Sequence, residues 1–257
     1  MVVLELKGHL AVVRLERPEK MNALSRRMLA ELGEAFARVE LDGDVRACIL
    51  TGTGELGVFC AGTDIAELSE LDESGAQDAA RRGQEVCERI EHCRVPVTAA
   101  VNGLAAGGGC ELALSCHLRI ASTLAQFSLP ETKLGVIPAY GGSQRLPRII
   151  GHGRALEMML TGASMSAVEA QRAGLVNRVT TPEQLLAEAE SLAGEIAGLA
   201  PLAIRACLES VTRGGKMPLP EGLALEARLF SQLFSTEDMR EGTSAFLEKR
   251  APVFKGR

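Results

Sequence analysis

The sequence predicts an α/β protein with a helical C-terminal region. Up to about residue 180, apolar runs rich in β-branched residues alternate with helical patterns, whereas only helical patterns follow from residue 181. Residues 95–122 give the clearest pattern: a strand, a glycine loop, a short helix and a second strand. We therefore expect a core over residues 1–180 and a helical region over residues 181–257.

The glycine loop of this central stretch contains Gly107, Gly108 and Gly109 in succession. Each glycine loses much backbone entropy on folding, so a bare backbone here indicates a functional need. The first N–H groups of the helix that follows have no intrahelical partners, and they suit a developing negative charge. Glu111 lies in the first turn of that helix. Its simpler interpretation is a surface carboxylate that complements the helix dipole.

Several classes of function are disfavoured by motifs and composition. Leu112 replaces the third glycine of a dinucleotide fingerprint, and Gly109 replaces the lysine of a P-loop. A formal charge of -5 and 3% aromatic residues argue against nucleic-acid binding. The seven cysteines and four histidines show no zinc-ligand spacing, so we expect reduced thiols, no metal and a cytoplasmic location, with no signal or membrane segment.

The elements before residue 95 follow from periodicity and turn residues. A hairpin is expected over residues 2–6 and 10–15, and a helix from Ser25 to about residue 42. A strand over 45–50, a glycine-rich turn over 51–57 and a helix start at Asp64 come next. Residues 72–83 are polar without strong patterning and are expected to be mobile, and residues 84–92 form a helix.

The elements after residue 122 are mostly helical. A short strand over 125–129 precedes one helical turn at 130–134, and a second glycine and proline loop covers 135–142. Further helices are expected over 143–150, 152–161 and 166–173, with a strand over 176–179. Residues 181–184 match a capping box, and the last three helices are expected over 201–213, 220–234 and 237–250.

Two acidic residues occupy similar places in this pattern. Glu111 follows the first glycine loop, and Glu131 begins a helical turn twenty residues later. If both carboxyl groups face one pocket, one can accept a proton from a water molecule while the other delivers a proton to carbon. Like charges at that distance would raise the pKa of one of them. By contrast, Cys116 and His117 are adjacent residues and are assigned to structure rather than to a nucleophile pair.

A series of motifs in order along the chain resembles the crotonase superfamily, and within it enoyl-CoA hydratase. The motifs are 17–18, 22–24, 59–65, 100–103, 107–113, 130–135, 141–146, 160–162, 173–176 and 246–257. The resemblance covers essentially the whole chain. It implies a crotonase-like ββα-spiral core over residues 1–180 and a C-terminal region over residues 181–257 that serves trimerisation and acts as a lid.

The resemblance also implies an activity, the reversible syn addition of water to a 2-enoyl-CoA to give a 3-hydroxyacyl-CoA. The backbone N–H groups of Thr63 and Gly108 would form an oxyanion hole for the thioester oxygen, and Glu111 and Glu131 would be the catalytic acids. The binding site for the substrate and its coenzyme A would be lined by Ala61, Thr63, Asp64, Ile65, Ala66, Gly108 and Ala139. No cofactor is implied, because coenzyme A is part of the substrate.

The expected partners are an acyl-CoA thioester and further copies of the chain, as a trimer or a dimer of trimers, with neither nucleic acid nor membrane. Other superfamily reactions stay open: enoyl-CoA isomerisation, or hydration of a branched or dicarboxylic enoyl-CoA such as methylglutaconyl-CoA. A non-catalytic acyl-CoA-binding subunit is a further alternative. Thr63 stands where many relatives have Ala, and Ala139-Tyr140 where they often have Gly-Ala. Tyr140 bears on the preferred acyl group.

Overall fold

The computed structural model describes residues 1–53 and 57–257. Its main sheet has six strands, in the order β1-β2-β3-β5-β7-β10. Their bounds are β1 Val2–Lys7, β2 Leu10–Leu15, β3 Ala47–Gly52, β5 Val97–Val101, β7 Leu118–Ser122 and β10 Arg178–Thr180. The predicted hairpin of β1 and β2 is confirmed as the antiparallel pair, and all other neighbours in this sheet are parallel.

A second, smaller sheet has four strands in the order β4-β6-β8-β9. They are β4 Val58–Cys60, β6 Leu104–Ala106, β8 Gln126–Ser128 and β9 Ser164–Ser166. The chain passes from the main sheet to the second sheet and then into a helical segment in three successive units, which begin with β3, β5 and β7. This repeated strand-strand-helix path is the expected ββα spiral, and it places the start of each helical segment beside the second sheet.

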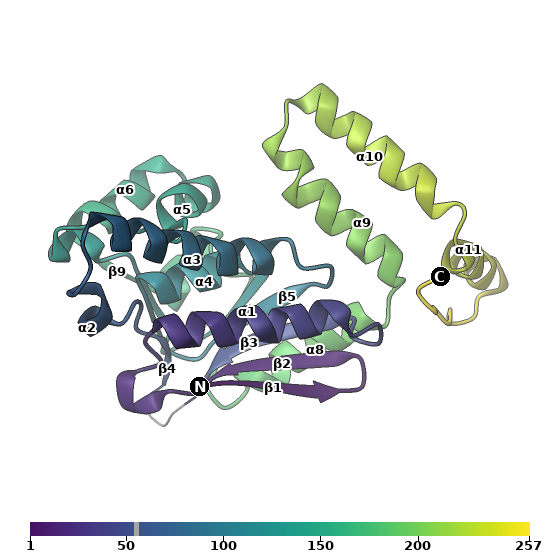
Figure 1. Cartoon of the computed structure of the whole chain (residues 1–257). Helices are drawn as coiled ribbons and strands as arrows, with labels where there is room; N and C mark the ends of the chain where they lie inside the picture. Colours follow the sequence, from purple (N-terminus) through teal and green to yellow (C-terminus); the bar gives the residue numbers. More distant parts are fainter. Residues whose placement is uncertain (54–56) are drawn as a thin grey trace.

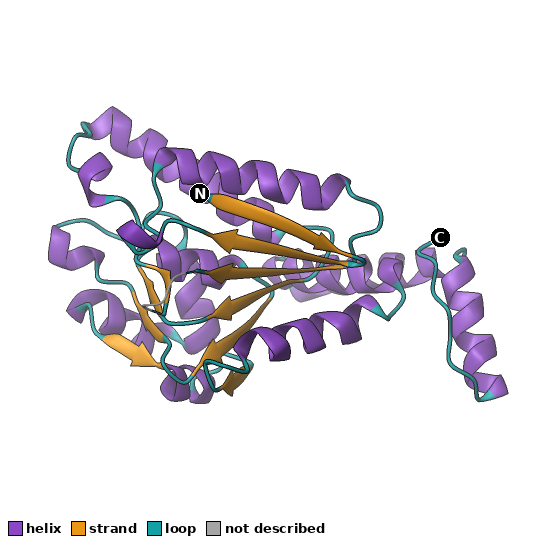
Figure 2. Ribbon diagram, turned by 90° about the horizontal axis from the view of Figure 1, so that it is seen from below, coloured by secondary structure: helices purple, strands orange, loops and turns teal. Residues whose placement is uncertain are grey.

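Helices cover both faces of the main sheet (Figure 2). On one face, α1 (Arg26–Leu41), α3 (Glu73–Glu91) and α4 (Gly108–Ser115) contribute buried residues to the larger core. On the other face, α8 (Leu185–Ala197) packs through its buried leucine and alanines onto the strands. The shorter elements are η1 Pro18–Lys20, α2 Ile65–Leu68, η2 Glu131–Leu134, α5 Gly142–Ile150, α6 His152–Thr161 and α7 Ala167–Arg172.

The two sheets and the helices packed on them, residues 1–53 and 57–200, are called the body. The last helices stand away from this body (Figure 1). They are α9 (Pro201–Thr212), η3 (Gly214–Lys216), α10 (Leu219–Leu233) and α11 (Glu237–Glu248), and we call residues 201–250 the arm. No residue of α9 is buried. In the described chain no single helix has the length and hydropathy of a membrane span. Helix α8 and residues 201–216 have the required length and hydropathy only when taken together, and they are bent by 106° relative to each other.

Four sequence expectations are wrong or incomplete. The polar residues 72–83 are not an irregular segment, because Asp72 accepts the Gly75 N–H at 2.8 Å and starts α3 there. The capping box at residues 181–184 does not form, since α8 begins at Leu185 after Gln184, which makes no side-chain cap. The strands β4, β6 and β9 were not predicted, and the expected turn at 51–57 overlaps β3 and includes residues 54–56, outside the described residues.

The cysteines are divided sharply between the body and the arm. The six in the body are free and buried: Cys48, Cys60, Cys87, Cys93, Cys110 and Cys116. Burial raises the pKa of the Cys60 and Cys116 thiols to about 12. These thiols therefore serve as small apolar side chains of the core, whereas Cys207 on α9 is exposed.

Candidate functional site

Glu111 is a buried carboxyl group at the start of α4, with 2% of its surface exposed. Its Oε1 accepts the backbone N–H groups of Tyr140 at 2.8 Å and Gly142 at 2.6 Å. Burial raises the pKa of Glu111 to about 7, and the charge of Glu131 adds to this rise, while the two N–H donors act against it. Near neutrality this group can therefore both take up and release a proton.

Glu131 opens η2 and points toward the glycine loop. A Cβ built on Gly107 would lie 2.9 Å from Glu131 Oε1, and Gly107 has a φ of 50°, so a side chain there would be strained and would crowd the carboxyl group. Burial raises the pKa of Glu131. Its Oε2 is buried and has no hydrogen-bond partner within the described residues. A buried acceptor without a partner normally indicates a place for water or ligand.

Two backbone N–H groups lie side by side near these acids. Gly62 has a φ of 105°, and a Cβ built on it would lie 3.5 Å from the Gly108 nitrogen, which brings the Gly62–Thr63 peptide next to the start of α4. Across residues 1–53 and 57–257, the N–H groups of Thr63 and Gly108 donate to no protein acceptor. Such a pair can bind an oxygen atom that gains negative charge.

The other residues expected to line the substrate lie between β4 and α2, on α2, and in the loop before α5. Asp64 caps α2 by accepting the Ala66 N–H at 3.1 Å, and Arg17 binds its other oxygen at 2.8 Å. The Arg17 side chain lowers the pKa of Asp64, so this carboxylate supports the local structure. Ile65 and Ala66 are exposed on α2, and Ala61 lies partly buried beside them. The Ala139 carbonyl accepts Gln84 Nε2 at 2.9 Å.

Sequence reasoning missed the role of the loop before α5 in holding Glu111. Arg145 donates to the Tyr140 carbonyl at 2.9 Å and to Glu91 Oε2 at 2.8 Å, which fixes the turn whose N–H groups bind Glu111. A Cβ on Gly142 would lie 2.9 Å from Glu111 Cγ. The paired glycines at 141–142 were the available signal, because they repeat the close backbone approach seen at residues 107–109.

The structure also places the residues that were set aside. His117 Nδ1 accepts the Val97 N–H at 2.9 Å, and burial lowers the pKa of His117 to about 4, so its ring is neutral. The Cys116 thiol faces the Leu112 carbonyl at 3.4 Å. Both residues hold structure, as expected. Among residues 1–53 and 57–257, no group of three His, Cys, Asp or Glu side chains could hold a metal ion.

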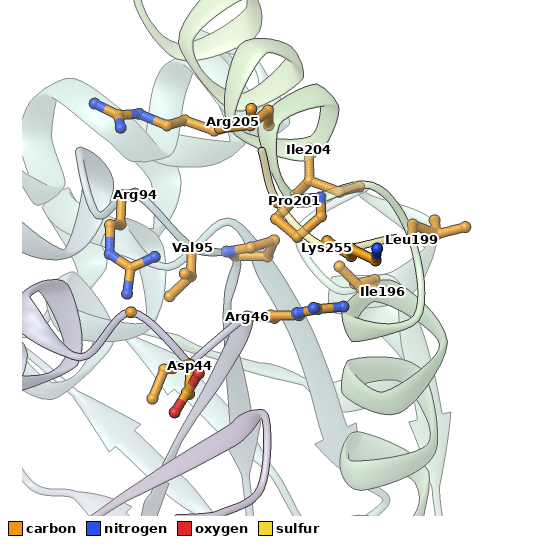
Figure 3. Close-up of a pocket in the computed structure, with 15 residues that line it drawn as sticks. Asp44, Arg46, Arg94, Val95, Ile196, Leu199, Pro201, Ile204, Arg205 and Lys255 are labelled. Atoms are coloured by element: carbon orange, nitrogen blue, oxygen red, sulfur yellow. The ribbon is translucent and has the colours of Figure 1, made fainter. Parts of the chain in front are cut away.

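A separate basic hollow lies where the arm joins the body (Figure 3). It is lined by Arg46, Arg94, Arg205 and Lys255, among others. Arg46 donates to the Ala197 carbonyl at 3.3 Å and to the Phe254 carbonyl at 3.1 Å, and Arg94 donates to the Glu40 carbonyl at 2.7 Å. Because these guanidinium groups bind backbone carbonyls, we interpret the hollow as a structural joint rather than as a substrate site.

The two-sheet ββα spiral, with its buried carboxyls beside paired N–H groups, defines a protein of the crotonase class. The family model described as enoyl-CoA hydratase/isomerase matches residues 5–257. A short-chain-enoyl-CoA hydratase of Clostridium acetobutylicum is 42% identical over 97% of this chain and 95% of its own. An (E)-benzylidenesuccinyl-CoA hydratase of Thauera aromatica is 44% identical over 99% of each chain.

A crystal structure of enoyl-CoA hydratase from Bacillus anthracis has a TM-score of 0.96 at 38% identity, and the match covers 100% of this chain and 99% of that one. The chain belongs to the enoyl-CoA hydratase/isomerase family of the crotonase superfamily. It is an enzyme of the hydro-lyase class, an enoyl-CoA hydratase.

Proposed function

We propose that this enzyme adds water reversibly and in the syn sense across the double bond of a 2-enoyl-CoA, giving a 3-hydroxyacyl-CoA. The hydroxyl group of water bonds to the β-carbon and a proton bonds to the α-carbon, while the π-bond between them is lost. Negative charge develops on the thioester oxygen during attack. The reaction consumes no oxidant or reductant, and we propose no cofactor beyond the coenzyme A of the substrate.

The observation that carries the proposal is the unpartnered Oε2 of Glu131 beside the buried, proton-binding carboxyl of Glu111. A water molecule between the two groups would satisfy the orphan acceptor. One carboxylate can then take a proton from that water while the other carboxylic acid donates a proton to the α-carbon. Both groups are needed at once, which favours hydration over a reaction that requires a single acid.

The N–H groups of Thr63 and Gly108 supply the second part of the proposed mechanism. Both are free of protein acceptors within the described chain, and the N-terminal end of α4 adds its positive dipole. Binding the developing enolate oxygen there would lower the barrier, and one such donor is worth about 3 kcal/mol in enzymes where it has been removed. Asp64, Ile65 and Ala66 on the exposed side of this pair are proposed to face the nucleotide end of coenzyme A.

The test is loss of the conjugated enoyl-thioester absorbance when crotonyl-CoA is added to the purified protein. We expect Glu111→Gln and Glu131→Gln each to lower kcat by about 10²- to 10⁴-fold, because each removes one proton-transfer group. Glu195→Gln is the matched control, since Glu195 is exposed on α8. Its rate should equal that of the wild type.

The outcomes separate the alternatives. A wild type that shifts the double bond of a 3-enoyl-CoA without hydrating it would replace the proposal by isomerisation. Turnover confined to a branched or dicarboxylic enoyl-CoA would keep the reaction and change the acyl group. Acyl-CoA binding without turnover of any enoyl thioester would make the chain a binding subunit.

We also propose that the protein works in the cytoplasm as a homo-oligomer, either a trimer or a dimer of trimers. The arm supports the assembly, because it exposes large apolar side chains; Phe230, Phe246 and Leu247 are 63%, 83% and 80% exposed in the single chain. Exposed apolar side chains of this size commonly mark an interface when they gather on one surface. The seven free cysteines support a reducing compartment.

A further inference from the structure

The side chain of Tyr140 occupies a fixed place between two helices near the acids. Tyr140 as a whole is 4% exposed. A Cβ built on Gly83, in the interior of α3, would overlap the ring, and a Cβ on Gly108 would lie 3.1 Å from Tyr140 Cε2. Glycine in a helix interior is destabilising relative to alanine. Gly83 is needed at this position because a larger side chain would overlap the Tyr140 ring, and we call Gly83 the seat of that ring.

The same residue touches both halves of the proposed catalytic machinery. The backbone N–H of Tyr140 binds Glu111 Oε1 at 2.8 Å, while its ring lies against Gly108, one of the two proposed oxyanion donors. Tyr140 also lines the same cavity as Thr63, the other donor residue. An acyl group whose thioester oxygen binds these donors and whose β-carbon faces the acids must therefore pass along the ring.

The ring also forms part of the wall of a cavity of about 290 Å³. Apolar side chains of Leu24, Leu29, Leu68 and Leu71 line it together with Thr63. Charged residues also line it: Arg26, Glu67, Glu70 and Arg82. A long apolar tail would bring these charged groups into contact with hydrocarbon, which costs free energy because charges are strongly hydrated.

We propose that Tyr140, seated on Gly83, is the residue that limits acyl-chain length and makes this hydratase selective for short enoyl groups. The inference rests on the proposed function. The ring fills the space between α3 and the start of α4, where additional methylenes would otherwise lie. One methylene in a hydrophobic pocket changes discrimination by about 10- to 200-fold, so a wall of this size is sufficient to separate short from long chains.

The experiment measures kcat/KM for 2-enoyl-CoA substrates of four, eight and ten carbons. Tyr140→Ala is expected to raise the ratio of eight-carbon to four-carbon kcat/KM by about tenfold or more, since removing the ring frees apolar space. Tyr140→Phe keeps the wall and should leave the ratio within about twofold of the wild type. Thermal melting verifies that each variant is folded.

Gly83→Ala tests the seat itself. The new methyl group overlaps the ring, so this variant should lose four-carbon activity, and the loss should disappear when Tyr140→Ala is added. A purely structural role for Gly83 would instead give additive losses. Unchanged chain-length ratios in a folded Tyr140→Ala enzyme would overturn the proposal, as would additivity in the double variant.

Binding separates this inference from the proposed reaction. Calorimetry with butyryl-CoA and octanoyl-CoA, which cannot be hydrated, should show that Tyr140→Ala improves the affinity for octanoyl-CoA relative to butyryl-CoA. If the wild type hydrates no enoyl-CoA and this ratio still rises, the proposed function fails and the chain-length wall stands. If hydration proceeds and neither the kinetic nor the binding ratio moves, the wall fails alone.

Discussion

The body and the arm bury their apolar side chains to very different extents. In the body, Phe36, Phe59 and Phe127 are fully buried. In the arm, α9 buries no residue, and Phe246 is 83% exposed. The body therefore forms its hydrophobic core within one chain. The arm buries few apolar side chains, among them Leu225, Leu229 and Ala245, and it leaves other large apolar side chains exposed.

The largest expected effect tests the completeness of the body. Phe36→Ala removes a fully buried ring from α1 and should lower the free energy of unfolding by about 3–5 kcal/mol. Leu41→Ala, on the same helix, is the control, because Leu41 is 85% exposed and its truncation should stay within about 0.5 kcal/mol. Urea denaturation measures both. Equal losses in the two variants would contradict the burial of Phe36 in the core of the body.

The next effect is the pH dependence of the free energy of unfolding that the buried carboxyl group of Glu111 causes. The pKa of Glu111 is about 7 in the folded state against 4.5 for an exposed glutamate, so the folded state binds the proton more tightly. The associated stability is fully present below pH 4.5 and is lost as the pH rises to about 7. The free energy of unfolding of the wild type, relative to Glu111→Gln, should thus fall on the order of 3 kcal/mol over that range.

Glu241 in the arm is the control for this pH dependence. Its ion pair with Arg250 lowers its pKa to about 2, so its contribution is present above pH 4.5 and is lost as the pH falls toward 2. The free energy of unfolding of the wild type, relative to Glu241→Gln, should therefore fall as the pH drops from 4.5 toward 2. A Glu111→Gln difference that does not change between pH 4.5 and 7 would show that the buried carboxyl titrates normally.

The smallest effect sharpens the view of the arm. Phe246→Asp places a charge on its apolar surface and should weaken assembly by about tenfold, which corresponds to about 1.4 kcal/mol, while circular dichroism stays unchanged. Sedimentation over a range of protein concentrations measures the dissociation constant. Leu41→Asp changes an equally exposed apolar residue of the body and should not change the mass of the assembly or its dissociation constant. Unchanged assembly in Phe246→Asp would remove the arm from the interface.

Much of the fold could be predicted because its patterns are local. The hairpin, the amphipathic helix after Ser25 and the strand-loop-helix-strand of residues 95–122 each carry their own periodicity or turn residues. The strands β6 and β9 have three residues each, which is too short for an alternating pattern to be recognised. The start of α3 was missed because one cap at Asp72 outweighs a weak apolar stripe.

The candidate site was only partly accessible to sequence reasoning. Glu111 and Glu131 could be linked because each follows a glycine or proline signal, and the structure does bring the two carboxyl groups within electrostatic reach of each other. The seat of Tyr140 on Gly83 could not be anticipated, since 57 positions separate the two residues. A glycine inside a helix shows that space is needed, but only the folded chain shows which side chain fills it.

The distribution of cysteines allows unfolding of the body to be followed by the reaction of the natural thiols. Six thiols lie inside the body and Cys207 lies exposed on α9, so a thiol-specific reagent meets one accessible sulfur in the native chain and seven after the body opens. The slow reagent uptake then counts unfolding events of the body without any engineered label. A dye attached to Cys207 at the same time marks the arm alone, so its emission can follow subunit exchange while the buried thiols stay silent.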